Sequence, residues 1–230
     1  MFNIVAIKKG GTLSTVYITR HGQANTGARD HHEYDKLSPL GHQQAQWLGE
    51  FFAMNGISFD RIYSGDLQRQ QQTAQGINSA GVEHVIDERL NEFDYFGLSH
   101  DIETRIGIPY PETQDDFKDY ILNMITLWKN GEISSDLETY ESFHDRILSV
   151  VHDLSDRGEN ALLVSSSGVI ASLVARLLNV PLKDQPKLFL SVSHTCLNRF
   201  ERMCGDLTPT LFCATPHLDR PDRSHARTFI

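Results

Sequence analysis

The sequence predicts an α/β fold, a three-layer α/β/α sandwich around a mostly parallel central sheet. Short apolar segments typical of buried strands alternate along the chain with longer segments whose apolar residues recur at helical spacing. The clearest example is Ala161–Ser165, a continuous strand pattern that turns through Ser166-Ser167-Gly168 into a helical stripe. Because a strand, a helix and a second strand usually return to one sheet in parallel, this alternation favours parallel strands.

The first elements are recognised from strand patterns and helix-end signals. Thr15–Thr19 is short, apolar and β-branched, which predicts a buried strand. Ser38 supplies an N-cap with Pro39 at the first helical position, and Asn55-Gly56 ends that helix. Phe59–Ser64 is the second predicted strand.

The middle of the chain is less regular. Asp66 is expected to cap the next helix, which stops near Gly81, and Val82–Ile86 is a weaker strand. Residues 91–135 are predicted to form a helical insertion, because an irregular stretch leads into one clear helix that closes at Asn130-Gly131.

The last elements complete the sandwich. A helix with an apolar stripe from Phe143 to Leu154 precedes the Ala161–Ser165 strand, and Cys196–Glu201 and Thr210–Ala214 are predicted late strands. With 230 residues, the chain is expected to be one domain with its core at about residues 13–218. The polar tail, residues 219–230, is expected to be loosely held.

Composition excludes several function classes. The 21 Lys and Arg against 30 Asp and Glu give a formal net charge of −9, so general nucleic-acid binding is disfavoured. Cys196, Cys204 and Cys213 form an odd, unclustered set, which argues against a disulfide framework and favours a cytoplasmic location. No apolar run approaches the ~20 residues that cross a bilayer, so no membrane partner is expected.

Three loops follow predicted strands and should lie at one edge of the sheet. They are Arg20-His21-Gly22, Ser64-Gly65-Asp66 and Ser166-Ser167-Gly168. In open α/β sheets, ligands bind at the carboxyl ends of the strands. These loops are therefore the predicted ligand site.

Arg20-His21-Gly22-Gln23 is the segment most suited to chemistry. A guanidinium offers two donors to an oxyanion, and a neutral imidazole is a nucleophile. Gly22 allows close backbone approach to a ligand. An isolated Arg-His pair is more often a turn with an exposed histidine. The presence of Arg69, one turn into a helix that begins beside a strand end, favours an anion site instead.

Six segments together resemble the histidine phosphatase superfamily, which is also called phosphoglycerate mutase-like. The resemblance continues to Pro216-His217-Leu218 and so covers nearly the whole chain. The matching segments are Thr19 to Ala24, Leu37 to Ala45, Tyr63 to Ala74, Arg89 to Phe93, Glu141 to Phe143 and Val164 to Ile170.

The resemblance implies a role for each matching side chain. His21 would be the nucleophile that becomes a phosphohistidine, and Arg20 and Arg69 would hold the phosphoryl oxygens. Glu92 would protonate the leaving oxygen and later activate water. Repulsion from a bound phosphate and burial would raise the pKa of such a carboxyl. From the residues alone, other nearby carboxylates stand on equal terms with it, namely Glu88, Asp94 and Glu103.

One departure from the family pattern is large. The family usually has a second histidine where this chain has Ser166, and losing one such donor typically costs on the order of 10²–10³ in rate. Either the chain is similar to a subgroup with serine there, in which Ser166 still donates, or it is weakly active or a non-catalytic phosphate-binding module. His194 is a further candidate for the missing imidazole, although a loop histidine without a role is commoner. Gln23 and Ser167 are also predicted phosphate or substrate contacts.

Other chemistries are disfavoured. His31, His32 and His42 lack the companion ligands of a familiar metal site, so neither a metal nor another cofactor is expected. P-loop, nucleophile-elbow and dinucleotide-binding motifs do not occur.

The predicted function is metal-independent hydrolysis of a small phosphorylated substrate, with inorganic phosphate as product. A phosphoglycerate-type mutase is the alternative, but the loop after His21 matches mutases poorly and Arg105 is the only cation in residues 91–112. Specificity is expected from aromatic residues of the insertion. The oligomeric state is not fixed by the sequence, and a dimer is kept open. The expected pocket residues are Phe93, Tyr95, Phe96 and Tyr110.

Overall fold

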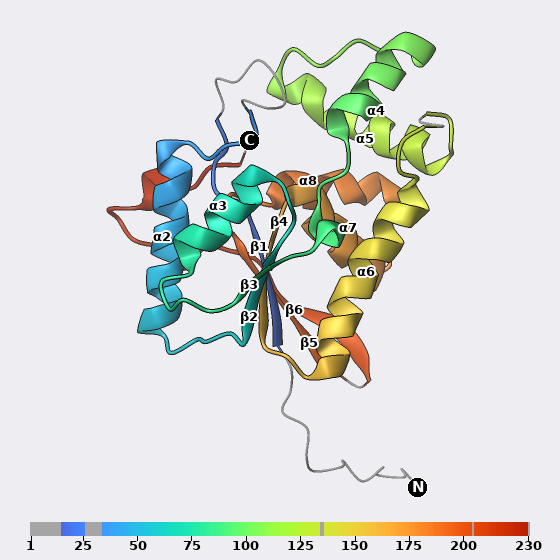
Figure 1. Cartoon of the computed structure of the whole chain (residues 1–230). Helices are drawn as coiled ribbons and strands as arrows, with labels where there is room; N and C mark the ends of the chain where they lie inside the picture. The colour runs from blue at the N-terminus through green and yellow to red at the C-terminus, as the bar shows by residue number, and fades with distance from the viewer. Residues whose placement is uncertain (1–14, 26–33, 134–135, 204, 230) are drawn as a thin grey trace, which may run out of the picture.

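The centre of the molecule is a six-stranded sheet, formed within the residues that the computed structural model describes (15–25, 34–133, 136–203 and 205–229) (Figure 1). Its strand order is β3-β2-β4-β1-β5-β6, and only β5 runs against the other strands. The mostly parallel sheet that the sequence predicts is confirmed. The strands are β1 (Thr15–Arg20), β2 (Arg61–Ser64), β3 (His84–Ile86), β4 (Ala161–Ser165), β5 (Leu197–Met203) and β6 (Asp206–Ala214).

Helices cover both faces of this sheet. Figure 1 shows α2 (Pro39–Met54) and α3 (Gln68–Ile77) on one side, and α6 (Tyr140–Arg157) and α7 (Ser167–Leu177) on the other. Side chains of β4 alternate between the two layers, so that Leu162 packs with α2 and α3 while Leu163 packs with α6 and α7. A strand buried on both faces reads as a continuous apolar run, which is why β4 is the clearest strand in the sequence.

Helix ends show where local sequence signals succeed and where they fail. The Ser38 hydroxyl accepts a hydrogen bond from Gly41 N, as expected of an N-cap. The expectation that Asp66 caps α3 is wrong. That helix begins at Gln68, whose N–H donates instead to the Asp35 carboxylate at 2.9 Å.

The insertion lies over the carboxyl ends of the parallel strands (Figure 1). Its Trp128 packs against Phe93 and Phe143, with ring centroids 5.3 and 5.4 Å apart, which joins it to the main core. Its elements are η1 (Glu88–Leu90), α4 (Tyr95–Asp101), η2 (Ile102–Ile106) and α5 (Gln114–Lys129). Beside it, η3 (Leu182–Asp184) leads into α8 (Gln185–Ser191).

The described part of the C-terminal tail is docked, not loosely held. It forms η4 (Ser224–Ala226), and Ala226 is fully buried. The Arg223 guanidinium lies 4.7 Å from the centre of the Trp47 ring and donates to Glu50. The tail is polar because arginines and hydroxyl groups make these attachments, and composition alone therefore gives the wrong expectation.

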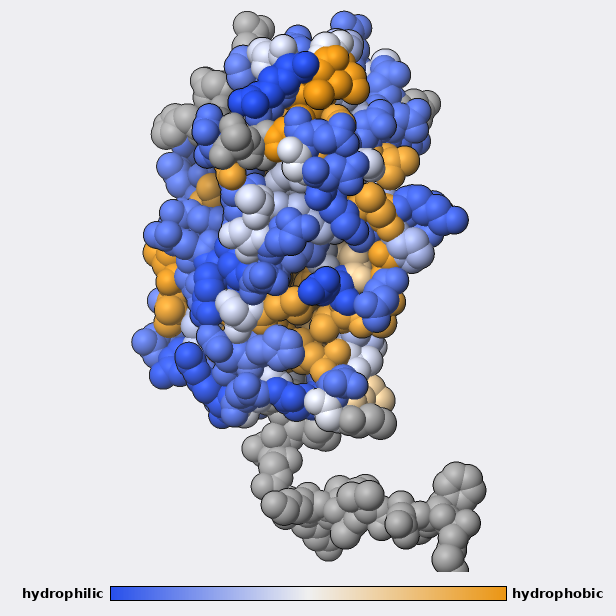
Figure 2. All heavy atoms as spheres, turned by 90° about the vertical axis from the view of Figure 1, so that its right-hand side faces the viewer, coloured by the Kyte–Doolittle hydropathy of each residue, from blue (hydrophilic) through white to orange (hydrophobic). Residues whose placement is uncertain are grey.

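The surface, the helices and the cysteines of the described part of the chain give little further information about function. Figure 2 shows the face that is on the right of Figure 1, where apolar side chains gather in the lower half and again near the top. No helix in the described part of the chain is long and apolar enough to cross a membrane. Cys196 and Cys213 are free thiols, and Cys204 lies outside the described residues.

Candidate active site

The sheet register brings two of the predicted loops together. Arg20 and Ser165 are paired at the ends of β1 and β4, and His21 N donates to Ser165 O at 2.8 Å. In β2, Ser64 pairs with Val164 at the same edge. The loops after β1, β2 and β4 therefore meet at the carboxyl ends of these strands, as the sequence predicts.

His21 is buried, and its hydrogen bonds fix which nitrogen carries the proton. Nδ1 lies 2.7 Å from the Gly22 carbonyl oxygen, which can only accept, so Nδ1 carries the hydrogen. Nε2 accepts from Arg69 Nε at 3.2 Å. Burial, followed by the charges of Arg69 and Arg20, holds the pKa of His21 well below its usual 6.5. The ring is therefore a neutral imidazole with its Nε2 lone pair facing a cation.

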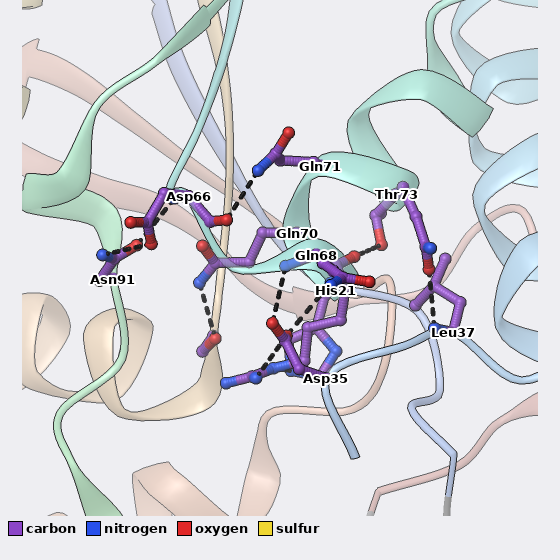
Figure 3. Close-up of polar contacts among 12 residues, drawn as sticks. His21, Asp35, Leu37, Asp66, Gln68, Gln70, Gln71, Thr73 and Asn91 are labelled. Atoms are coloured by element: carbon purple, nitrogen blue, oxygen red, sulfur yellow. Dashed lines mark hydrogen bonds and ion pairs between the residues drawn. The ribbon is translucent and has the colours of Figure 1, made fainter. Parts of the chain in front are cut away.

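Arg69 is held by Asp35, a residue that the sequence analysis does not single out. Asp35 Oδ1 accepts from Arg69 Nη1 at 2.9 Å, and the same carboxylate accepts from the first N–H groups of α3 (Figure 3). The Tyr34 ring lies 5.3 Å from the Arg69 guanidinium carbon, a cation–π contact. No local pattern marks Asp35, because its partners are more than thirty residues away in the sequence.

Arg20 is buried and only partly paired. Its Nη1 donates to Val192 O at 2.6 Å and also to Phe229 O. Its Nε has no hydrogen-bond partner in the described part of the chain. Burial lowers the pKa of this guanidinium from its usual range. A bound oxyanion would give the unpaired donor a partner, and Arg20 lines the cavity into which such an anion would fit.

Glu92 reaches the start of α7. Its Oε2 accepts from Gly168 N at 2.8 Å, and Oε1 accepts from Phe93 N at 3.1 Å. Burial raises the pKa of this carboxyl, against the opposing effect of these hydrogen bonds. A β-carbon at Gly168 would overlap Glu92 Oε1, so the glycine makes room for the acid. Glu92 lines the same cavity as His21, and the three other candidate carboxylates do not.

Gly22 and Gln23 are placed by packing against α2. A β-carbon on Gly22 would overlap the Gly41 carbonyl oxygen, so this glycine is required by the helix, not by approach to a ligand. Gly22 N donates to Thr73 Oγ1 at 2.9 Å. Gln23 Oε1 accepts from Ser38 Oγ at 2.7 Å, and neither residue lines the cavity.

The two serines after β4 differ in their surroundings. The Ser166 hydroxyl is almost fully buried, accepts from Gln70 Nε2 at 2.9 Å and does not line the cavity (Gln70 is labelled in Figure 3). Ser167 does line it. The loop is therefore split, because Ser166 turns its hydroxyl into the protein whereas Ser167 lines the cavity.

His194 lies close to the imidazole of His21. The two ring centroids are 5.8 Å apart, and both rings are buried. His194 Nδ1 lies 2.9 Å from Thr228 Oγ1 in the C-terminal segment. Burial, followed by the charge of Arg20, holds the pKa of His194 well below 6.5, so this ring is neutral as well.

The cavity is about 220 Å³ and is lined by thirteen described residues. Arg20, His21, Arg69, Glu92 and Ser167 form its polar end. The rest of the lining is aromatic, and it includes all four predicted pocket residues. The aromatic residues that sequence reasoning missed are Tyr34, Phe117, Phe189 and Phe229, which come from four separate segments.

A metal centre has no counterpart in the described residues, where no three His, Cys, Asp or Glu side chains cluster. His42 is exposed on α2. His31 and His32 lie outside the described residues.

Residues 16–212 match the family model of the histidine phosphatase superfamily, branch 1. The chain belongs to this superfamily. The adenosylcobalamin/alpha-ribazole phosphatase of Escherichia coli is 32% identical over 175 residues, which is 72% of this chain and 80% of that protein. The rat 6-phosphofructo-2-kinase/fructose-2,6-bisphosphatase 1 is 26% identical over 92% of this chain. The chain spans only 43% of the length of that relative.

Solved structures of similar proteins support the fold. Bacillus stearothermophilus YhfR matches with a TM-score of 0.65 and 22% identity, over 89% of this chain and 98% of that chain. A mutant phosphoserine phosphatase from Entamoeba histolytica, in complex with phosphoserine, matches with a TM-score of 0.62 and 22% identity, over 90% and 100%. The chain is thus a phosphatase-like or mutase-like member of the superfamily.

Proposed function

We propose that this chain is a metal-independent phosphomonoesterase in which His21 carries the phosphoryl group. The observation behind this proposal is the state of the His21 ring. Its Nδ1 hydrogen is held by Gly22 O, its pKa is depressed, and its Nε2 lies 3.2 Å from Arg69 Nε. A neutral imidazole beside a phosphate-binding cation can attack phosphorus at neutral pH.

The reaction has two in-line steps. His21 Nε2 forms a bond to phosphorus while the P–O bond to the alcohol breaks, and Glu92 gives its proton to the leaving oxygen. Glu92 then takes a proton from water as the water oxygen attacks phosphorus and the P–N bond breaks. The products are the alcohol and inorganic phosphate, and the ring nitrogen regains its lone pair. Arg20 and Arg69 hold the equatorial oxygens.

We assign the role of the missing second imidazole to His194 rather than Ser166, because its ring centroid lies 5.8 Å from that of His21, although neither residue lines the cavity. Gln44 Oε1 accepts from Gln23 N at 2.8 Å, and Gln44 Nε2 donates to Thr228 Oγ1 at 3.0 Å. His194 Nδ1 lies 2.9 Å from that hydroxyl and 3.2 Å from the Thr228 carbonyl oxygen, which can only accept, so Nδ1 carries the hydrogen of the neutral ring. The negative charge of a bound phosphoryl group raises the pKa of a nearby imidazole, so the ring can take up a second proton on Nε2 and donate it to a phosphoryl oxygen.

The alternatives have less support. A mutase acts on substrates that carry a second anionic group, but Arg20 and Arg69 are the only cations that line the cavity within the described residues. A non-catalytic binding module would not need a carboxyl with a raised pKa beside the neutral imidazole. Membership of a serine-bearing subgroup remains a prediction from the sequence.

The deciding experiment compares wild type with His21→Ala, using His42→Ala as an exposed control. We expect wild type and the control to hydrolyse p-nitrophenyl phosphate in the presence of EDTA and to form an acid-labile phosphoenzyme. His21→Ala should do neither while keeping its circular dichroism spectrum. Activity retained by His21→Ala, or activity lost in EDTA and restored by a divalent ion, contradicts the proposal.

A further inference from the structure

The lining of the cavity is mostly aromatic. Eight of its thirteen lining residues are aromatic. Ser167, at the polar end, is the only aliphatic hydroxyl residue in the described lining, and no amide or lysine side chain lines it. The groups that usually bind sugar hydroxyls are therefore scarce, whereas apolar surface is abundant.

The aromatic rings contact one another and form a continuous wall. Tyr34 and Phe96 meet edge to face at 6.5 Å between centroids, and Phe96 meets Tyr95 at 5.5 Å. Tyr95 in turn contacts Tyr110 at 6.0 Å. Such edge-to-face packing leaves flat faces for a planar guest. Phe189 of α8 and the Phe229 side chain line other parts of the cavity.

Charge restricts the rest of the substrate. The two lining cations lie beside His21, where they would face the phosphoryl group, and Arg105 is outside the lining and pairs with Asp101 at 3.4 Å. A second phosphate or a carboxylate on the substrate would have to lie unpaired against aromatic rings. Burial of an unpaired charge is strongly unfavourable, so such substrates are excluded.

We propose that the substrate is a phosphate monoester of an aromatic or similarly flat, apolar alcohol that carries no second charge. The volume fits this class. A dry cavity of about 150 Å³ binds benzene. The cavity here, at about 220 Å³, has room for a phosphoryl group and an aromatic ring that extends to the rim. The exposed Tyr110 and the buried hydroxyl of Tyr95, which has no hydrogen-bond partner among the residues that the structure describes, can each accept or donate a hydrogen bond to the substrate. This inference rests on the proposed phosphatase function.

The test compares phosphate esters of primary alcohols, so that the leaving-group chemistry is the same. We expect kcat/KM for 2-naphthylmethyl phosphate to exceed that for glycerol 3-phosphate and glucose 6-phosphate by about tenfold or more. Fructose 1,6-bisphosphate should be a poorer substrate still. Equal or better turnover of the sugar phosphates would overturn the assignment and leave the phosphatase function intact.

Variants of the aromatic wall test whether these rings cause the preference for the aromatic ester. Phe96→Ala and Tyr110→Ala should lower kcat/KM for the naphthylmethyl ester severalfold, mainly through KM, and by a larger factor than they lower kcat/KM for glycerol 3-phosphate. Ile106→Ala is the matched control, because Ile106 is 42% exposed, close to the 43% of Phe96, but does not line the cavity. Equal losses for all substrates would contradict the proposal.

A binding measurement distinguishes a failure of the proposed phosphatase function from a failure of the proposed ligand class. 2-Naphthylmethylphosphonate, which cannot be hydrolysed, should bind wild type more tightly than methylphosphonate in calorimetry. If it does so while no ester is turned over and no phosphoenzyme forms, the proposed function fails but the ligand class holds. Equal binding of the two phosphonates overturns the ligand class.

Discussion

The guanidinium of Arg20 donates a hydrogen bond to the backbone oxygen of Phe229. This contact joins the end of β1 to a segment more than two hundred residues later in the chain, and the Phe229 ring lines the cavity. Together with Val192 O, it orients the guanidinium while Nε stays unpaired. The C-terminal segment is therefore part of the site architecture.

Removal of residues 228–230 should impair catalysis more than folding. Arg20 loses one of its two carbonyl partners and His194 loses Thr228, whereas Ala226 remains to accept from Gln44. We expect kcat/KM for p-nitrophenyl phosphate to fall by about tenfold to a hundredfold, because small misplacements of catalytic groups have effects of this size. Phe229→Leu, which keeps the carbonyl but removes an aromatic lining residue, separates the loss of the hydrogen bond from the loss of the ring. Full activity in the shortened chain would show that the contact is dispensable.

Asp35→Ala should lower both stability and activity. The carboxylate caps α3 and pairs with Arg69, so its removal should cost about 1 kcal/mol of stability for the cap and loosen the guanidinium. We expect a fall in urea midpoint and at least a tenfold fall in kcat/KM. Asp66→Ala removes a carboxylate that contacts Asn91 instead, and should leave kcat/KM within about twofold. A larger loss of stability and activity in Asp66→Ala than in Asp35→Ala would indicate that Asp66 caps α3.

His194→Ala should reduce kcat far more than Ser166→Ala. Loss of a preorganised donor to the phosphoryl group costs on the order of 10²–10³ in rate. Ser166 accepts from Gln70, which also donates to Leu90 O, so removal of its hydroxyl should change kcat little. Thr228→Val tests the orientation of the His194 ring, and its effect should be smaller and confined to kcat. A large loss in Ser166→Ala with a mild effect in His194→Ala would reverse the assignment.

The pH dependence of stability follows from the buried histidines. Burial depresses the pKa of His21 and His194 well below 6.5 and lowers that of His217 to about 4. Below pH 6.5 the unfolded chain binds protons that the folded chain does not. The free energy of unfolding should therefore fall as the pH drops from about 6.5 to about 4. Urea titrations across this pH range measure the free energy of unfolding. An unchanged urea midpoint would contradict the predicted loss of stability.

Glu92 should control the alkaline side of the rate profile. Its raised pKa keeps it protonated at a higher pH than a free carboxyl, and the reaction slows once that proton is lost. We expect Glu92→Gln to remove the alkaline limb of kcat/KM and to impair alkyl esters more than p-nitrophenyl phosphate, whose leaving group needs less protonation. An equal loss for both substrates would argue against an acid role.

The sequence predicts the elements whose signals are local. The strand β4, the Ser38 cap and the helix ending at Asn130 each depend on residues within one turn or strand, and all are confirmed. Asp35 was missed because its partners lie on α3, far along the chain. The capping role given to Asp66 is wrong for the same reason, since a distant carboxylate occupies that position.

At the candidate site, too, features set by local sequence are predicted and features set by distant contacts are not. The loops after β1 and β4 meet as predicted, because the parallel register of those strands determines where both end. The tail, however, reaches the site through backbone carbonyls and a threonine hydroxyl, and polar composition cannot distinguish such docking from loose attachment. The sequence also does not show that Gly22 lies against Gly41 of α2, because a glycine needed for close approach to a helix looks the same as one needed for close approach to a ligand.

The contact between Gly22 and Gly41 has a practical consequence for mutational scanning. Any side chain at either position would force the start of α2 away from the loop that carries His21. Both positions would therefore score as intolerant in a screen based on turnover, although neither lines the cavity. Only a parallel readout of protein abundance would separate such scaffold positions from residues that handle the substrate.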